Sequence, residues 1–185
     1  MKKFAIAGAA AALLAIPAAA NAQAFVQVET GLDSVSVDGE SDEGVNYGIS
    51  AGYDLPLSGG MFVGIQGTVA DSTVKECASD VLTVGDRLCV KTGRDLAAVV
   101  RLGTSVGDKS KLYVLGGYTN ARIRATYTDG VDSASDGANG DGFRLGAGYQ
   151  YDLSDRLFLK AEYRYSNYES DISRHNAIVA LGAKF

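Results

Sequence analysis

The stretch FRLGAGYQYDLSDRLFLKAEYRY, residues 143–165, decides the fold because its side chains alternate in character over two long runs. In the first run the odd positions are apolar or aromatic, and the even positions are Arg, Gly, Gln and Asp. The second run repeats this pattern, and the Ser-Asp pair at 154–155 between the runs favours a tight turn. Because successive side chains of a β-strand point to opposite faces, the stretch predicts two antiparallel strands joined as a hairpin.

The same alternation recurs along the chain and predicts an all-β fold of eight strands. Breaks rich in Gly, Asp and Ser separate the strands, and short breaks alternate with longer ones. Most of the strands have about ten residues or more, which is enough to cross a bilayer when tilted. This pattern is typical of an antiparallel up-and-down transmembrane β-barrel. The predicted strands are 24–34, 43–56, 60–71, 93–106, 111–127, 141–153, 156–168 and 173–185.

The N-terminus has the composition of a secretory signal peptide. A basic start precedes an apolar run over 4–16, which is too short to span a bilayer comfortably, and a small-residue cleavage site ends at residue 22. We therefore predict a cleaved signal peptide at 1–22 and an exported barrel domain at 23–185.

Two cysteines, Cys77 and Cys89, remain in the exported chain. An even number of cysteines in an exported protein indicates a disulfide. A metal pair would need nearby His ligands, and the chain has one His in total. The sequence therefore predicts a Cys77–Cys89 disulfide that closes a surface loop, with no metal site and no cofactor.

One face of the predicted strands carries charged residues and many glycines, whereas the other face is apolar. An eight-stranded barrel has an interior just wide enough for side chains. Glycines beside long arginines fit a tight, polar, salt-bridged lumen, so that the apolar face meets lipid. Arg122 and Arg124 share a face with Val114 and Tyr118, which indicates a β-bulge or a shifted register. The predicted lumen charge network comprises Glu29, Arg101, Arg122, Arg124, Arg144, Lys160, Glu162 and Arg164.

Aromatic residues fall near the ends of the strands, where the rings of a membrane barrel lie at headgroup depth. The girdle on the periplasmic side would comprise Tyr53, Tyr113, Tyr151 and Phe185. The girdle on the outer side would comprise Tyr47, Tyr127 and Tyr165.

The last two hairpin segments carry a family resemblance. The chain ends in NAIVALGAKF, residues 176–185, with apolar residues at alternate positions up to the terminal Phe185. The stretch GAGYQYDLSDRLFLKAEYRY, residues 146–165, is similar to the penultimate hairpin of small OmpA-like and opacity-type porin-family outer-membrane barrels. The resemblance implies location in the cell outer membrane, with Phe185 in the C-terminal signal that the barrel-assembly machinery recognises. The expected partners are that machinery, periplasmic chaperones, outer-membrane lipid and lipopolysaccharide, and the barrel is expected to be a monomer.

The composition argues against other classes of protein. The formal net charge is −5, from Lys+Arg 17 and Asp+Glu 22, whereas a nucleic-acid partner requires a basic face. The single long apolar run is N-terminal, so a helical membrane protein is not expected. A lipocalin is a rival eight-stranded fold, but it needs an apolar interior, and its Gly-x-Trp signature is missing because the chain has no Trp.

Three functions stay open at this point. We predict a structural role in envelope integrity, or an interaction through the surface loops, without enzymatic activity. The first alternative is a narrow porin for small solutes, in which the excess of Arg and Lys named for the lumen would favour anions. The second is a lipid-modifying enzyme, because Ser173, His175 and Glu169 could combine to activate a hydroxyl nucleophile.

Overall fold

The computed structural model describes residues 23–37, 40–80, 85–129, 132–169 and 172–185 of the chain. The predicted signal peptide at 1–22 lies outside the described residues. The described part is almost entirely β-strand, with one short 3-10 helix, η1 (Ser58–Gly60). No helix in this part of the chain combines the length and the hydrophobicity that a membrane span needs.

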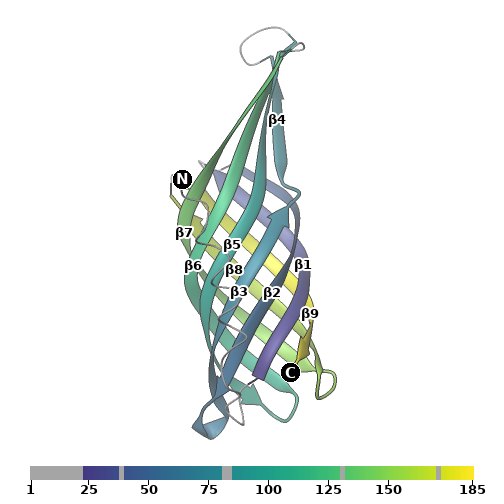
Figure 1. Ribbon diagram of the computed structural model, residues 1–185, viewed down its shortest axis with the longest axis vertical. Helices are drawn as coiled ribbons and strands as arrows, with labels where there is room; N and C mark the ends of the chain where they lie inside the picture. Colours follow the sequence, from purple (N-terminus) through teal and green to yellow (C-terminus); the bar gives the residue numbers. More distant parts are fainter. Residues whose placement is uncertain (1–22, 38–39, 81–84, 130–131, 170–171) are drawn as a thin grey trace, which may run out of the picture.

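Antiparallel strands form a single closed sheet in the described part of the chain (Figure 1). The strands are β1 (Gln23–Val37), β2 (Glu40–Pro56), β3 (Met61–Ser72), β4 (Lys75–Ser79), β5 (Arg87–Val106), β6 (Ser110–Thr128), β7 (Ser133–Asp152), β8 (Leu157–Tyr168) and β9 (Ile172–Lys184). β4 follows β3 closely and pairs with the same neighbour, β5, so β3 and β4 together take the place of one strand of the barrel. β1 pairs with both β2 and β9. With β3 and β4 counted as one strand, this pairing closes the predicted eight-stranded up-and-down barrel.

Several strands extend further at one end than the sequence pattern predicts. β5 begins inside the segment 72–92, and β7 begins inside the segment 128–140, both of which the sequence favours as loops. These outer parts contain many polar and glycine residues, so their hydropathy does not mark them as strands. They are strands nonetheless because their backbone groups hydrogen-bond to the neighbouring strands, and β6 pairs with β7 along its whole length.

Four strands project beyond the barrel rim as one narrow sheet, which we call the blade (Figure 1). Its parts are residues 75–79 of β4, 87–94 of β5, 120–128 of β6 and 133–141 of β7. Cys77 and Cys89 are direct cross-strand partners in the blade and form the predicted disulfide, with an S–S distance of 2.06 Å. β8 pairs with β7 only from Gly142 onward, so the blade ends at an open strand edge within the described residues.

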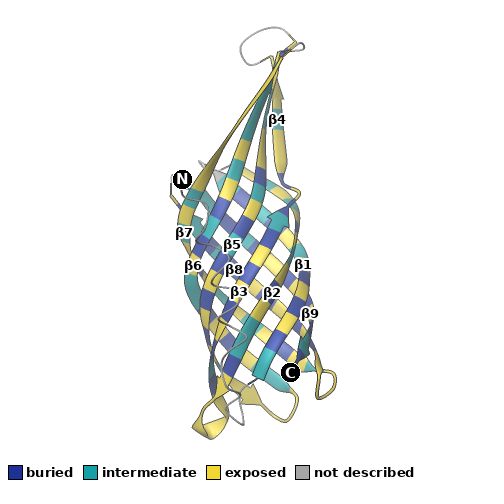
Figure 2. Cartoon of the chain, viewed as in Figure 1, coloured by how far each residue is buried: buried dark blue, intermediate teal, exposed yellow. Residues whose placement is uncertain are grey.

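Buried and more exposed residues alternate along the strands of the barrel wall (Figure 2). On β8, for example, Lys160, Glu162 and Arg164 are buried and their neighbours are more exposed. The outward positions are largely apolar, and Val28 and Ile49 are each 60% exposed. A polar interior inside a continuous apolar exterior is the reverse of a soluble protein and matches a barrel surrounded by lipid.

Short turns close the end of the barrel opposite the blade, which we call the turn end. Gly59 and Gly107 have positive φ angles of 74° and 67° in these turns, a left-handed conformation that glycine adopts without steric cost. The chain also ends here. Phe185 is 78% exposed, and its backbone N–H donates to the carbonyl of Ala24 at 2.9 Å.

Candidate functional site

The lumen gathers the charged side chains into layers, and the first layer lies at the turn end. Arg101 and Lys111 both approach Asp54, at 3.1 Å and 3.6 Å. At the same end the ammonium group of Lys184 donates to Asp152 at 2.6 Å. These five residues come from β2, β5, β6, β7 and β9, so the layer connects strands that are far apart in the sequence.

An aromatic layer lies next to this charged layer. It consists of Phe25, Phe62, Tyr113 and Phe158, all of which are buried. The guanidinium carbon of Arg101 lies 4.9 Å from the ring centroid of Phe25 and 4.2 Å from that of Tyr113, distances at which the ring faces attract the cation. Gly182 provides the space for one ring, because a Cβ atom there would overlap the ring of Phe158. Rings of this size fill much of an eight-stranded lumen.

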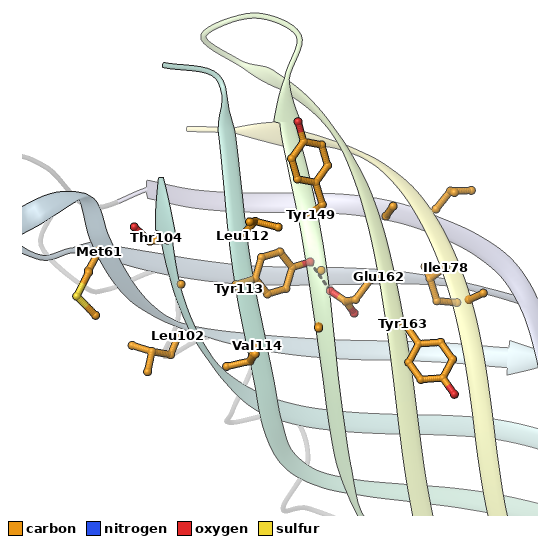
Figure 3. Close-up of a pocket in the computed structure, with 16 residues that line it drawn as sticks. Met61, Leu102, Thr104, Leu112, Tyr113, Val114, Tyr149, Glu162, Tyr163 and Ile178 are labelled. Atoms are coloured by element: carbon orange, nitrogen blue, oxygen red, sulfur yellow. Dashed lines mark hydrogen bonds between the residues drawn. The ribbon is translucent and has the colours of Figure 1, made fainter. Parts of the chain in front are cut away.

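The central layer is built around the guanidinium group of Arg164. It donates to the two oxygens of Glu29 at 2.6 Å and 3.0 Å and also to Glu162. Tyr113 points from the aromatic layer toward Glu162 and donates its hydroxyl to the carboxylate at 2.5 Å (Figure 3). Ser50 donates to Glu29 at 2.7 Å. Two carboxylates therefore share one cation, and neighbouring hydroxyl groups satisfy their remaining acceptor positions.

Lys160 links the aromatic and central layers. Its ammonium group donates to the side-chain oxygen of Gln66 at 3.2 Å and lies 4.8 Å from the ring centroid of Phe25. This contact places a cation between the rings and the two glutamates of the central layer.

The third charged layer lies toward the blade. Arg174 donates to both oxygens of Asp33 at 2.7 Å and to Asp95 at 3.1 Å. Arg144 donates to Asp95 at 2.5 Å, and Asn176 donates to Asp33 at 2.8 Å. The fork of Arg174 matches the carboxylate of Asp33 in the bidentate geometry that makes such pairs strong and directional.

The buried charges of the three layers are close to balanced. The carboxylates are Glu29, Asp33, Asp54, Asp95, Asp152 and Glu162, and the cations are Arg101, Lys111, Arg144, Lys160, Arg164, Arg174 and Lys184. Removing an ion from water costs several kcal/mol unless a partner compensates for it. The ion pairs and hydrogen bonds provide that compensation, and they cross-link the barrel wall from inside.

Arg122 and Arg124 do not belong to this network, so the prediction for these two residues is corrected. The bulge lies on β5, between Thr92 and Asp95, and β6 keeps its alternation past it. Both arginines therefore stay on the lipid-facing side of β6, above the barrel rim, and are exposed. The other six predicted residues are buried in the lumen, as expected. They are Glu29, Arg101, Arg144, Lys160, Glu162 and Arg164.

Sequence reasoning missed seven lumen charges, namely Asp33, Asp54, Asp95, Lys111, Asp152, Arg174 and Lys184. The alternation of side chains along β1 would have identified Asp33, because it lies on the same face of this strand as Glu29. Counting these residues reduces the cationic excess that the sequence indicates for the lumen to a single charge. The girdle position predicted for Tyr113 is also wrong, because the odd positions in this part of β6 face inward and Tyr113 is 4% exposed.

The possible catalytic residues Ser173, His175 and Glu169 do not assemble as a triad. Nδ1 of His175 hydrogen-bonds to the hydroxyl of Tyr163 at 2.6 Å, and the His175 ring centroid lies 5.0 Å from that of Tyr165. No hydrogen bond between Ser173 and His175 occurs among the described residues. The same part of the chain contains no group of three or more His, Cys, Asp or Glu side chains that could hold a metal ion.

Comparison with known families places the chain. The model of the outer membrane protein beta-barrel domain matches residues 6–185. The chain belongs to this family. This outer-membrane barrel is 25% identical over 159 residues to the 31 kDa outer-membrane immunogenic proteins of Brucella melitensis and Brucella suis. The alignment covers 75% of the chain but spans only 65% of the length of those relatives.

Solved structures share the fold of this outer-membrane barrel. Ail of Yersinia pestis aligns with a TM-score of 0.64 at 14% identity, over 89% of this chain and 99% of Ail. Neisserial surface protein A aligns with a TM-score of 0.59 at 17% identity, over 88% and 97% of the two chains. A major outer membrane protein of Thermus thermophilus gives 0.58 at 15% identity, over 89% and 99%. Family and fold together locate the protein in the cell outer membrane, as predicted.

Proposed function

We propose that the protein is a closed, non-conducting and non-enzymatic barrel that anchors the blade at the cell surface, in an envelope or surface-interaction role. The turn end would face the periplasm and the blade would project outward, as expected for a barrel with short periplasmic turns and long outer segments. The surrounding partners would be outer-membrane lipid and lipopolysaccharide, and the barrel would act as a monomer.

The filled lumen is the observation that carries this proposal. Three layers of ion pairs and one layer of aromatic rings follow one another between the turn end and the blade. A solute could pass only by displacing side chains that are hydrogen-bonded to one another. Breaking one buried ion pair costs about 3–5 kcal/mol, so these layers favour a plug over a pathway.

The blade supports the surface role. β5, β6 and β7 run from the barrel wall into the blade as single strands. The Cys77–Cys89 disulfide fixes the short outer strand β4 to β5. Interaction surfaces are often carried by segments that project from a rigid scaffold. A sheet that continues the barrel strands holds its side chains in a fixed arrangement, which a free loop would not do.

Single-channel conductance in a planar bilayer tests the proposal. Protein refolded in detergent, with folding confirmed by heat-modifiable migration on a gel, is expected to insert and remain electrically silent. Discrete, reproducible current steps from the same preparation would contradict a closed lumen and favour the narrow porin. Because the charges of the lumen are nearly balanced, such a pore would not be expected to show strong anion selectivity.

The enzymatic alternative has its own test. The double variant Ser173→Ala, His175→Ala is expected to leave the lipid A composition of cells unchanged, since Tyr163 already occupies Nδ1 of His175. A change in lipid A that depends on wild-type Ser173 and His175 would show that the barrel is an enzyme.

A further inference from the structure

The two faces of the blade differ in charge. Residues directly opposite each other in an antiparallel pair lie on the same face, so the register assigns each side chain to a face. One face continues the lumen and carries mainly apolar residues such as Val90, Ile123 and Tyr127. The other face continues the lipid-facing wall of the barrel. It carries six exposed cations, namely Lys75, Arg87, Lys91, Arg94, Arg122 and Arg124.

Three of these cations stand in one row across three strands. Lys75 is the register partner of Lys91, and Lys91 is in turn the partner of Arg124. Neighbouring strands lie about 4.8 Å apart, so like charges directly opposite each other destabilise the sheet. Arg94 and Arg122 lie at the bulge, next to this row on the side toward the barrel. We call these five residues the cationic rows.

Two carboxylates of β7 in the blade, Asp136 and Asp141, do not pair with the cationic rows. Asp136 lies on the opposite face, because its partner across β6 is Ala125. Asp141, at the base of the blade, is engaged by the hydroxyl of Tyr118 at 2.5 Å and the amide of Asn120 at 2.6 Å. None of the ion pairs found among the described residues involves a residue of the cationic rows.

Two further features hold together and expose the row of Lys75, Lys91 and Arg124, whereas Arg94 beside it donates to the side-chain oxygen of Asn120 at 3.3 Å. The disulfide lies two residues away from both Lys75 and Lys91, on the same face, so it fixes β4 against the repulsion between these two side chains. Gly137 lies opposite Arg124 on β7 and offers no side chain to cover the row. A Cβ atom there would lie 3.2 Å from Nε of Arg122, which shows that this guanidinium lies over bare backbone.

We propose that the cationic rows bind phosphate groups of the glycolipid in the outer leaflet, as a phosphorylated lipopolysaccharide would present them. An anion bound among these cations would reduce the repulsion between them. Anion binding therefore explains why the blade keeps an arrangement of like charges that destabilises the folded sheet. The local charge is not a consequence of composition, because the chain as a whole has a net charge of −5.

Position along the strand favours a membrane-anchored phosphate over a soluble one. On β6 the lipid-facing side chain of Tyr118 is followed on the same face by Asn120, Arg122 and Arg124. At about 3.3 Å per residue, the two arginines lie roughly 13 Å and 20 Å further along the tilted strand. That range corresponds to the phosphorylated sugars just above the hydrocarbon. The inference rests on the outward orientation of the blade that is part of the proposed function.

Amide hydrogen exchange of the blade tests the inference directly. The disulfide-bonded barrel is placed in nanodiscs of phosphatidylcholine with or without rough lipopolysaccharide, and exchange is followed in residues 87–94 and 120–128. Lipopolysaccharide with intact phosphates is expected to slow exchange there about tenfold, and dephosphorylated lipopolysaccharide is expected to have little effect. The double variant Lys91→Gln, Arg124→Gln should lose the protection. The matched variant Lys109→Gln, Arg156→Gln removes two exposed cations at the turn end and should keep it.

The outcomes separate the sources of phosphate. Inositol hexakisphosphate added to plain phosphatidylcholine nanodiscs is the soluble probe. If it protects the blade while lipopolysaccharide does not, the site recognises a soluble polyanion and the glycolipid assignment is wrong. Equal protection in the wild type and the Lys91→Gln, Arg124→Gln variant would also overturn the inference. Gel migration confirms that each variant is folded, and conductance of the same samples tests the closed barrel independently.

Discussion

The lumen and the blade are both rich in Arg and Lys, but they treat these charges in opposite ways. In the lumen Arg164 faces two carboxylates, and its ion pairs are almost fully desolvated. On the blade Lys91 faces a cation on each side and is exposed. Burial makes pairing obligatory, because an unpaired charge in the interior is far more costly than repulsion between solvated charges. The lumen charges are therefore set by folding, whereas the blade charges are free to be set by function.

The largest expected effect comes from breaking a lumen pair. Arg164→Met leaves Glu29 and Glu162 buried beside each other without their shared cation, so the free energy of unfolding should fall by about 3–5 kcal/mol. Urea unfolding in detergent micelles measures this change. Arg122→Met is the control on the blade and should change stability by no more than about 0.5 kcal/mol.

A further substitution keeps this comparison interpretable if Arg164→Met does not refold. Arg164→Lys retains the charge but loses the planar fork, and its stability should lie between those of the wild type and the Met variant. Equal stability of Arg164→Met and Arg122→Met would mean that the lumen pairs do not hold the barrel together.

The second effect concerns the disulfide, which should stabilise the blade and leave the barrel unaffected. The bond joins residues separated by 12 in the sequence, and a loop of this size corresponds to about 3 kcal/mol in the chain-entropy account. Reduction should accelerate amide exchange in residues 75–79, and the heat-modifiable migration of the barrel should persist. The acceleration should be greater at low salt, because salt screens the repulsion between Lys75 and Lys91.

The architecture can be predicted from the sequence because apolar and polar residues alternate strongly wherever one face of a strand meets lipid. The prediction is weaker where both faces of a strand are polar. Residues 128–140 have the composition of a loop since their Gly, Ser and Asp are typical of turns, yet β7 begins at Ser133 because a neighbouring backbone pairs with it.

The partners within the lumen are the least predictable part of the structure. Arg174 lies only two residues beyond the start of β9, and the bulge between Thr92 and Asp95 shifts the register of β5 against β6. The ion pair between Asp95 and Arg174 therefore depends on the closure of the barrel, which no local sequence pattern encodes. Asp95 and Arg174 meet at 3.1 Å although they are distant in sequence.

A smaller effect, and one of opposite sign, is expected when the cationic rows are broken. Lys91→Glu would place a carboxylate between Lys75 and Arg124, so the blade should gain about 0.2–1 kcal/mol per cross-strand pair. Slower amide exchange of residues 87–94 in detergent without glycolipid would record the gain. Lys109→Glu in a turn should show no such change, and faster exchange in Lys91→Glu would argue against repulsion in the wild type.

The smallest effect on the folded barrel is expected at Phe185. Its side chain is exposed at the turn end and its backbone N–H bonds to Ala24 in any variant, so Phe185→Ala should alter the free energy of unfolding by about 0.5 kcal/mol or less. Assembly in cells should nevertheless fall, as measured by the amount of heat-modifiable barrel in the outer membrane. Phe143→Ala, another exposed aromatic residue, is the control and should assemble normally.

The pairing of β1 with β9 has a kinetic consequence. Phe25 is the register partner of Lys184, so the seam between β1 and β9 joins strands that are far apart in the sequence. Contacts between such distant residues form slowly, because the entropy of loop closure must be overcome before they become favourable. Until that seam forms, both terminal strands present open edges and the lipid-facing residues have no bilayer around them. The time between export and closure is therefore the period in which the chain is most prone to aggregate, and a holding chaperone would act in this period.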